Sequence, residues 1–543
     1  MARIRRAVVP ERFAIPARVA EGRLRCAVAY AERDGRPSAA MLLPTVAESQ
    51  RWWLAGADGR ALRAPVVADL AVPVVRIVDD ADAGVVELDL PWPGDAHDCA
   101  LLLLLHGQFA GADSDAVMPA HVPPGAAAQA ALATLMHTSA ADLDRGVVRR
   151  RRQGLGSDAP QAFALASDQF PAGPLDGCVH HTPWLPTVAD VGPAGRSLLR
   201  LAQRFEAEPA LALTVLCGNQ VCVGMSAGLF NPGHLATPFE FAYQRLADNV
   251  GLQRLLRCGS EVVALIDDHE IAARWEPLPA GSPQREENAA LLEKQALPWY
   301  LERQRRLWPP PSDPPRRLWS ARKLAGHAFF FADTRTEREC RQIANFSRAR
   351  LMSPAQNDAL LAWIGQQAAD RQPAFLVCPS PVLPRPMLVQ QSAAMALHVD
   401  SWSGWPASQH AVLAHIWDRA PFALVLLSGG GYPAHLARVT LRCDADPGRE
   451  VVVHAVHSSP LYAPYPFAHA SAADLAGDET FGFDHPGADG TQRRFSCTVS
   501  TWFACAGDGF AVLRSRRVGA QGWQLDIEFD GTCSMANRSL RFG

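Results

Sequence analysis

The stretch that decides the fold is Glu261–Pro277, which reads EVVALIDDHEIAARWEP. Its first part, Glu261–Ile266, is an apolar run of strand length and predicts a buried strand. Directly after it, Asp267–Glu270 places two carboxylates, an imidazole and a third carboxylate within one short turn. Carboxylate and imidazole groups are the usual ligands of Mn, Fe, Zn and Ca ions in proteins. A helix N-cap with acidic residues in its first turn explains the same residues about equally well, so both interpretations stay open at this point.

Polar or glycine-rich turns follow several other apolar runs in the same way. Helical stretches such as Phe239–Leu256 separate these runs, which is typical of an α/β domain. Because ligands of open α/β sheets bind at the carboxyl ends of the strands, the turns predict one shared site. The runs with their turns are Ala210–Leu216 with Cys217–Gln220, Phe329–Phe331 with Ala332–Arg335, Phe375–Val377 with Cys378–Ser380, and Phe422–Leu427 with Ser428–Gly431.

Length and composition set the broad class of the protein. The chain has 543 residues, too many for one ordinary hydrophobic core, so we expect two domains or one large elaborated domain. Apolar residues make up 48% and charged residues 20%, which is the balance of a globular protein. A net charge of −3 and a pI near 6.6 argue against a general nucleic-acid or membrane-surface partner.

The N-terminus and the cysteines predict a cytoplasmic protein. Arg5 and Arg6 are not followed by a long apolar segment, because Pro10, Glu11, Arg12 and Pro16 interrupt the sequence. We therefore expect neither a secretory nor a twin-arginine signal. The longest apolar run, Ala100–Leu105, is too short to cross a bilayer and predicts a buried strand. The 12 cysteines form no CxxC pair, and we expect them to be reduced thiols.

The first part of the chain differs in pattern from the rest. Short apolar runs alternate with turns up to about residue 155, which predicts a β-rich N-terminal domain with one helix at Ala126–Met136. The basic run that begins at Arg149 and ends in Gln153–Gly156 is interpreted as a solvated linker. We therefore place the domain boundary between 1–155 and 156–543. The strand-like runs of the first domain include Val66–Val67, Val74–Val78 and Val85–Leu90.

The residues around the Asp267–Glu270 turn resemble the PhoD-like (alkaline phosphatase D) branch of the metallophosphatases. Asp267–Pro277 is similar to the family's DDHEIxxxWEP signature, and Phe163–Asp176 is similar to its FALASCQYPAGLLD segment. Leu216–Pro232 resembles GDQIYADATAGLFDP, and Phe331–Arg338 contains a DTR motif like that of the family. The resemblance covers about residues 160 to 530. Further similar segments, in the family's order, are Cys378–Pro384, Asp400–Ala407, Leu427–Val439 and His457–Phe467.

This resemblance implies a fold, an activity and a set of site residues. The implied fold for 156–543 is a four-layer α/β/β/α metallophosphatase sandwich. The implied activity is hydrolysis of phosphomonoesters and phosphodiesters at a two-metal site, with Ca and Fe or similar ions. On this basis His269 and Arg335 are candidate catalytic residues. The candidate metal ligands are Asp168, Asp267 and Asp268.

Most of the other metal positions of the family carry residues that cannot serve as ligands. Together the substitutions remove three aspartates and one imidazole, so the repulsion between two divalent ions would be largely uncompensated. Asp168, which stands for a family cysteine, is the one replacement that still suits a hard ion. The other replacements are Asn219 for the aspartate of GDQ, Cys222 and Gly224 for the tyrosine and the second aspartate of that segment, and Gly430 and Tyr432 for the aspartate and histidine of SGDxH.

Two functional hypotheses follow. In the first, the chain is an inactive relative that binds no metal, or one divalent ion weakly. Such a relative would keep a pocket for a phosphate-containing small molecule, built from Arg335, His269 and the backbone N–H groups of Gly429–Gly431. In the second, it is an active phosphatase with one metal on Asp168, Asp267 and Asp268, and His269 is the general acid. Neither hypothesis involves a nucleic acid or a membrane, and the sequence indicates no particular protein partner.

Overall fold

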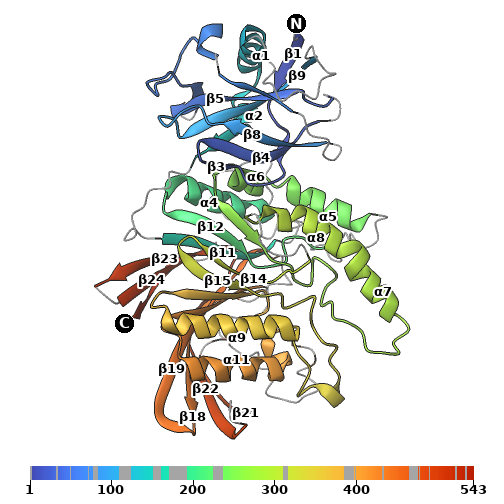
Figure 1. The fold of residues 1–543 in the computed structure, drawn as a ribbon, viewed down its shortest axis with the longest axis vertical. Helices are drawn as coiled ribbons and strands as arrows, with labels where there is room; N and C mark the ends of the chain where they lie inside the picture. Colours follow the sequence, from blue (N-terminus) through green and yellow to red (C-terminus); the bar gives the residue numbers. More distant parts are fainter. Residues whose placement is uncertain are drawn as a thin grey trace. The chain divides into compact units, whose positions relative to one another are not determined.

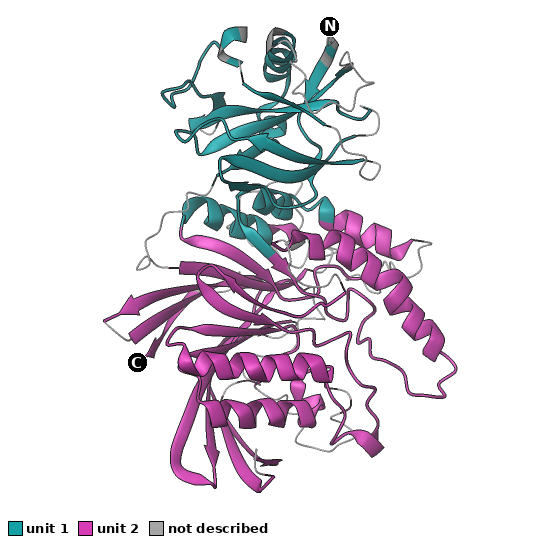
Figure 2. Ribbon diagram, in the orientation of Figure 1, with its two compact units in different colours: residues 1–154, 198–209, 247–262 teal, residues 155–197, 210–246, 263–543 magenta. Residues whose placement is uncertain are grey.

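The chain forms two compact units, which Figure 2 distinguishes by colour. Unit 1 comprises residues 1–154, 198–209 and 247–262, and unit 2 comprises 155–197, 210–246 and 263–543. The domain boundary predicted at residue 155 stays a prediction. The computed structural model describes residues 3–31, 35–48, 51–70, 72–77, 84–108, 124–150, 161–169, 193–223, 237–309, 316–383, 397, 399–430, 433–463, 475, 477–487, 490–519, 522–531 and 535–543.

Unit 1 is built on two antiparallel sheets. In the larger sheet the strand order is β1 (Arg3–Val8), β9 (Cys99–Gln108), β5 (Ala39–Glu48) and β6 (Arg51–Leu54), with β10 (Val147–Arg149) beside β9 and β7 (Val74–Arg76) beside β5. The smaller sheet has the order β2 (Arg12–Phe13), β4 (Arg23–Ala29) and β3 (Arg18–Ala20), with β8 (Val85–Pro91) beside β4. The helices are η2 (Val67–Leu70), α1 (Pro124–His137), α2 (Ala140–Asp144), α4 (Pro193–Ala207) from residue 198 on, and α6 (Val250–Arg257).

The apolar run expected to form a buried strand is the centre of the larger sheet in unit 1. Alternate residues Leu101, Leu103 and Leu105 of β9 share a core with Ala128 and Ala131 of α1, because successive side chains of a strand point to opposite faces. The helix expected at 126–136 is thus confirmed as α1. The strand expected at Val66–Val67 is wrong, since a short 3₁₀ helix, η2, begins at Val67.

Unit 2 contains two larger sheets (Figure 1). One has the order β13 (Glu261–Ala264), β12 (Leu211–Leu216), β11 (Gln161–Gln169), β23 (Gly509–Val518), β24 (Gly522–Gly531) and β25 (Met535–Phe542), with β20 (Pro460–Tyr462) beside β11. The other has the order β14 (Ser320–Leu324), β15 (His327–Phe331), β16 (Ala374–Cys378), β17 (Leu424–Gly429), β19 (Asp446–Ser458), β18 (Ala434–Cys443), β22 (Gln492–Cys505) and β21 (Gly477–Pro486).

Alternation along the central strands explains how the sheets of unit 2 are layered. Phe329 and Phe331 of β15 enter a core that also contains Leu513 and Ile527 of the other sheet, so the two sheets pack face to face. Phe330 points the opposite way, into the core beneath helices α9 (Pro354–Ala369) and α11 (Pro406–Arg419). Figure 1 shows these two helices side by side on the eight-stranded sheet. The result is a mixed α/β architecture, and the second helical layer of the expected four-layer sandwich stays a prediction.

The remaining helices of unit 2 are short. The helical stretch expected at 239–256 is confirmed, but as two helices: α5 ends at Ala247, and the Asn249 side chain caps α6 by accepting a hydrogen bond from the Leu252 amide. No helix in the described ranges is both long and apolar enough to span a membrane. These short helices are α5 (Pro238–Ala247), α7 (Arg285–Ala290), the π-helix η4 (Leu291–Ala296), α8 (Leu297–Arg303), η5 (Arg305–Leu307), η6 (Ile343–Asn345) and η8 (Trp402–Gly404).

Candidate functional site

The carboxyl ends of the strands in unit 2 bring the sequence-predicted residues to one place. Strands β11 and β12 are parallel, and so are β15, β16, β17 and β19. Asp168 lies at the end of β11, Asn219 follows β12, and Asp267 follows β13. Arg335 and Gly430 follow β15 and β17 of the other sheet. The turns therefore form a shared edge, as expected of an α/β sheet.

Glu270 holds two of these turns together. Its side chain is fully buried and accepts hydrogen bonds from the backbone amides of Asn219 (3.0 Å), Gln220 (2.6 Å) and Asp267 (2.9 Å). It also accepts one from the Gln304 side-chain amide at 3.1 Å. A buried carboxylate is tolerated only when its charge is balanced in this way. Glu270 is thus a structural clamp between the turns after β12 and β13.

Asn219 is fully engaged by its neighbours. Its backbone lies in the left-handed region with φ 59°, which asparagine adopts more readily than most residues. Its side-chain Oδ1 accepts from the His269 backbone amide at 3.1 Å, and its Nδ2 donates to Asp267 Oδ2 at 3.4 Å. Both ends of the amide therefore contact the Asp267–Glu270 turn.

Arg335 lies inside the cluster of carboxylates. Its Nε and Nη2 donate to Asp267 Oδ1 at 2.9 and 2.6 Å, and Nη2 also donates to Asp400 Oδ2 at 2.5 Å. Its Nη1 donates to the Trp275 carbonyl oxygen at 3.1 Å, and the side chain has no exposed surface. Asp267, Asp268 and Asp400 offer oxygens within 4.8 Å of one another, a geometry that could hold a metal ion. Arg335 Nη2 is 3.9 Å from Asp268 Oδ1, so a guanidinium contacts all three carboxylates.

The charges of this cluster stabilise one another. Burial alone would lower the pKa of Arg335, but Asp267 and Asp400 raise it well above its ordinary value. Burial would raise the pKa of Asp400, but Arg335 and Arg338 hold it well below its usual range. Arg338 Nη1 donates to Asp400 Oδ1 at 2.6 Å. Asp400 is a site residue that the sequence reasoning missed, although it begins one of the family-like segments.

Asp168 is the most constrained of the candidate ligands. Its φ is 40°, an unfavourable value for an aspartate, and such strain is often found at functional sites. The side chain is 1% exposed and has a side-chain hydrogen bond with Asn219, while its Oδ1 atom has no hydrogen-bond partner within the described residues. Burial raises the pKa of Asp168 to about 8, although His269 opposes the shift. A Cβ added at Gly430 would lie 4.0 Å from Asp168 Oδ2, so the position of the missing family aspartate faces Asp168.

His269 lies between a thiol and a carboxylate. Its Nδ1 is 3.4 Å from Cys222 Sγ, and its Nε2 is 3.8 Å from Asp268 Oδ2. Burial would lower the pKa of His269, but Asp268 and Cys222 raise it to about 10. Asp268 Oδ2 also accepts from the Arg274 amide at 2.6 Å. The chain after Glu270 forms turns rather than a helix, so the alternative interpretation of this segment as a helix N-cap is wrong.

The glycine turn after β17 is explained by close packing. A Cβ at Gly429 would lie 2.3 Å from the Cβ of Ser167, so only glycine fits where β17 approaches β11. The Gly430 amide donates to Ser167 Oγ at 2.8 Å. The other candidate positions here, Gly431 and Tyr432, lie outside the described residues, as does Gly224.

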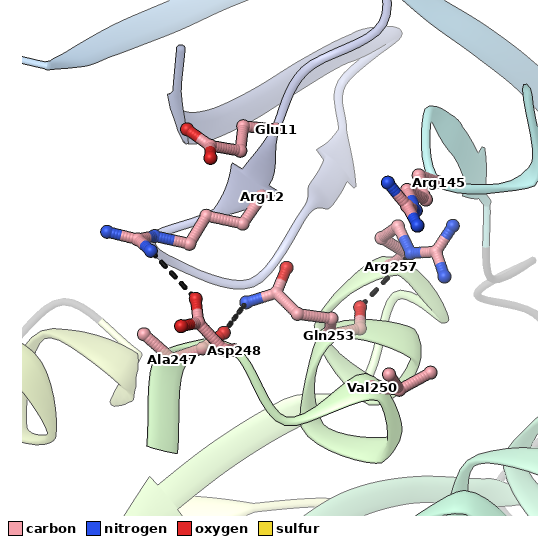
Figure 3. A pocket seen from close by; sticks show the side chains of 8 residues that line it. All are labelled: Glu11, Arg12, Arg145, Ala247, Asp248, Val250, Gln253 and Arg257. Carbon is pink, nitrogen blue, oxygen red and sulfur yellow. Dashed lines mark hydrogen bonds and ion pairs between the residues drawn. The ribbon is translucent and has the colours of Figure 1, made fainter. Parts of the chain in front are cut away.

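Unit 1 has a separate pocket of about 200 Å³ that contains none of the sequence-predicted site residues (Figure 3). Arg12 Nη1 pairs with Asp248 Oδ1 at 2.9 Å, and Arg257 Nε donates to the Gln253 carbonyl oxygen at 3.1 Å. The polar side chains of this pocket are thus largely paired within unit 1. The lining residues are Glu11, Arg12, Arg145, Ala247, Asp248, Val250, Gln253 and Arg257.

Comparison with known proteins gives a family match for part of the chain and a fold similar to that of a solved structure. A search of curated proteins finds no match. A solved structure titled "Structure of PhoD" is 12% identical with a TM-score of 0.50, covering 98% of this chain and 89% of that chain. A dimetal phosphatase from Danio rerio is 10% identical with a TM-score of 0.35, covering 69% of this chain and 98% of that chain. Residues 243–484 match the family model of the PhoD-like phosphatases. Residues 243–484 therefore resemble the PhoD-like phosphatase family, and the chain shares the mixed α/β fold of the PhoD structure.

Proposed function

We propose that this PhoD-like domain does not carry out two-metal phosphoester hydrolysis, and that Arg335 supplies the positive charge that a metal ion would otherwise supply to its acidic cluster. The observation that carries the proposal is the position of Arg335 Nη2, which donates to both Asp267 and Asp400. A cation bound by these carboxylates would have to displace a buried guanidinium. Removing one partner from such a buried pair costs about 3–5 kcal/mol.

The donor groups present also fit a two-metal centre poorly. A pair of divalent ions needs anionic oxygens to offset their repulsion. Asn219 offers a neutral amide whose Oδ1 already accepts from the His269 amide. Glu270 is occupied by backbone amides, and Gly430 has no side chain. Asp168 and Asp268 are then the carboxylates left to face an ion, too few for two coordination spheres.

One observation favours the alternative of an active one-metal phosphatase. The Oδ1 atom of Asp168 is buried and accepts no hydrogen bond within the described residues. A single divalent ion held by Asp168 and Asp268 would satisfy it and would supply Lewis-acid chemistry there. In that case His269 would protonate the leaving oxygen of the substrate, and Asp268 would orient the imidazole. Asp267 would stay paired with Arg335.

Metal content and turnover distinguish the two functions. The purified chain is supplied singly with Mn, Ca, Fe and Zn, then analysed for bound metal and assayed with p-nitrophenyl phosphate and bis-p-nitrophenyl phosphate. We expect no stoichiometric metal pair and turnover well below ~1 s⁻¹, the low end of ordinary enzyme rates. Turnover above that value that is lost in Asp268→Ala would overturn the proposal. The matched control is Asp478→Ala, which removes an exposed carboxylate on β21.

A further inference from the structure

We propose that the pocket of unit 1 binds a small zwitterion of the α-amino acid class, whose carboxylate contacts Arg145 and Arg257 and whose ammonium group contacts Glu11. The pocket has a volume of about 200 Å³, and every residue that lines it belongs to unit 1 (Figure 3). The inference goes beyond the proposed function, because it concerns a different unit and involves no phosphoester chemistry.

Hydrogen bonds between two distant segments of unit 1 fix the walls of this pocket. The Gln253 side chain of α6 accepts from the Phe13 amide at 2.7 Å and donates to the Phe13 carbonyl oxygen at 3.0 Å. It also donates to the Ala247 carbonyl oxygen at 2.9 Å. Arg12 Nη1 pairs with Asp248 Oδ1 at 2.9 Å and joins the same two segments. The pocket is therefore formed before any ligand enters, as small-molecule sites usually are.

Arg257 supplies a buried positive charge to the pocket. Its side chain is 8% exposed, and burial lowers its pKa although the Asp144 carboxylate opposes the shift. Its Nε donates to the Gln253 carbonyl oxygen at 3.1 Å, and its Nη1 donates to the Asp144 carbonyl oxygen. The Nη2 atom lies 3.7 Å from Asp144 Oδ2, which is longer than a hydrogen bond. An anion in the pocket would stabilise this guanidinium.

Arg145 lies on the same side of the pocket as Arg257 in Figure 3. It follows the short helix α2, and its side chain is 67% exposed. Its Nη1 is 3.4 Å from Asp142 Oδ1, and surface ion pairs of this kind contribute only about 0–1 kcal/mol. A ligand can therefore compete for Arg145 at little cost. Two guanidinium groups that line one pocket suit a carboxylate, which arginine binds through parallel N–H groups.

A carboxylate lies on the other side of the pocket in Figure 3. Glu11 is exposed, and its side chain has no hydrogen-bond or ion-pair partner in the part of the chain that the structure describes. Because Arg12 and Asp248 pair with each other, the charged groups that remain for a ligand are Arg145, Arg257 and Glu11. Charges of both signs on separate sides favour a ligand that also carries both.

The remaining lining residues and the volume limit the size and the side chain of the ligand. Ala247 and the exposed Val250 add apolar surface between the charged groups. An aliphatic ligand side chain would cover this surface and gain about 25 cal/mol for each Å² removed from water. Pockets for drug-sized ligands measure about 300–1,000 Å³, so this smaller pocket fits a single amino acid better than a peptide or a nucleotide. L-leucine is therefore a suitable probe.

Calorimetric titration of the full-length chain with L-leucine tests the proposal. Two probes of the same carbon skeleton serve as controls, 4-methylpentanoate without the ammonium group and 3-methylbutylamine without the carboxylate. We expect one leucine per chain, bound about tenfold or more tightly than either control, since a hydrogen bond to a charged group contributes about 1.5–3 kcal/mol. The absence of leucine binding, or binding of a control or of inorganic phosphate as tight as that of leucine, would overturn the proposal.

Variants at the two exposed charged residues separate the two ends of the ligand. Arg145→Gln should weaken the binding of leucine and of 4-methylpentanoate by about tenfold, and should change that of 3-methylbutylamine little. Glu11→Gln should weaken the binding of leucine and 3-methylbutylamine and spare 4-methylpentanoate. The matched control is Arg60→Gln, which changes an exposed arginine of unit 1 outside the pocket. Leucine binding that is unchanged in both pocket variants, or equally weakened in Arg60→Gln, would contradict the assignment.

Discussion

Replacing Arg335 by methionine tests whether a guanidinium is the counter-ion of the acidic cluster. The change removes the donors to Asp267, Asp400 and the Trp275 carbonyl oxygen. Asp400 keeps its ion pair with Arg338, and its side chain is 38% exposed. Solvent therefore screens the Asp400 charge when the contact with Arg335 is removed. Asp267 is 9% exposed, and within the described residues its side chain keeps only the weak 3.4 Å contact with Asn219. We expect a loss of about 3–5 kcal/mol in the free energy of unfolding, most of it from the unpaired Asp267.

Urea unfolding at pH 7, followed by tryptophan fluorescence and circular dichroism, measures this loss. The same unfolding experiment is repeated with divalent ions added, and the stabilisation of the variant is compared with that of the wild type. Without the guanidinium, Asp267, Asp268 and Asp400 still offer oxygens within 4.8 Å of one another. Mn²⁺ or Ca²⁺ should then stabilise Arg335→Met by about 2.7 kcal/mol at one hundred times the dissociation constant, but should leave the wild type nearly unchanged.

A double variant separates the charge effect from loss of packing. Arg335→Met combined with Asp267→Asn removes both buried charges and should recover most of the stability lost in the single variant. Arg335→Lys is the matched conservative change. It should keep only part of the wild-type stability, because an ammonium group cannot make the same set of planar hydrogen bonds as a guanidinium. An Arg335→Met protein as stable as the wild type, or metal stabilisation equal in both proteins, would refute the reasoning.

Two further variants probe the buried carboxylates. Burial raises the pKa of Asp168 from 3.8 to about 8 in the folded protein. Between these two pH values the folded protein keeps a proton that the unfolded chain has released. The free energy of unfolding therefore falls as the pH rises from about 4 to 8, by up to ~1.4 kcal/mol per pH unit. Asp168→Asn should remove this slope and gain stability relative to the wild type toward pH 8 in urea titrations with EDTA; parallel pH profiles would contradict it. Glu270→Gln places an N–H group where a carboxylate oxygen now accepts hydrogen bonds from backbone amides. We expect the free energy of unfolding, measured by thermal unfolding at pH 7, to fall by about 2–4 kcal/mol. The exposed Glu286→Gln serves as its control, and equal losses in both would contradict the clamp.

The positions of several strands along the chain were predictable because their signals are local. Apolar runs followed by polar turns marked β12, β13, β15, β16 and β17 within a few residues of their ends. A run such as Phe329–Phe331 is continuous in the sequence because both faces of β15 are covered, one by the second sheet and one by helices. The prediction failed where a local polar pair intervened, as at Asn249, because periodicity does not distinguish one long helix from two capped ones.

The side-chain contacts at this strand edge were not predictable in the same way. Asp267 and Arg335 are 68 residues apart, and Asp400 is a further 65 residues along the chain. Residue types indicated that carboxylates would gather, but spacing could not show that an arginine would lie among them. The Cys222–His269 contact likewise spans 47 residues, and a lone cysteine in an apolar context is more often a packing residue.

Within the Asp267–Glu270 turn, neighbouring residues have different physical tasks. Asp267 and Glu270 are buried and bonded, one to a guanidinium and the other to backbone amides. Those interactions hold the turn in place, so these two residues of the DDHE motif have a structural role. His269 instead contacts Cys222 and Asp268, and it interacts electrostatically with Asp168. We therefore expect variants of Asp268 or His269 to separate function from stability, which variants of the buried and bonded Asp267 or Glu270 cannot do.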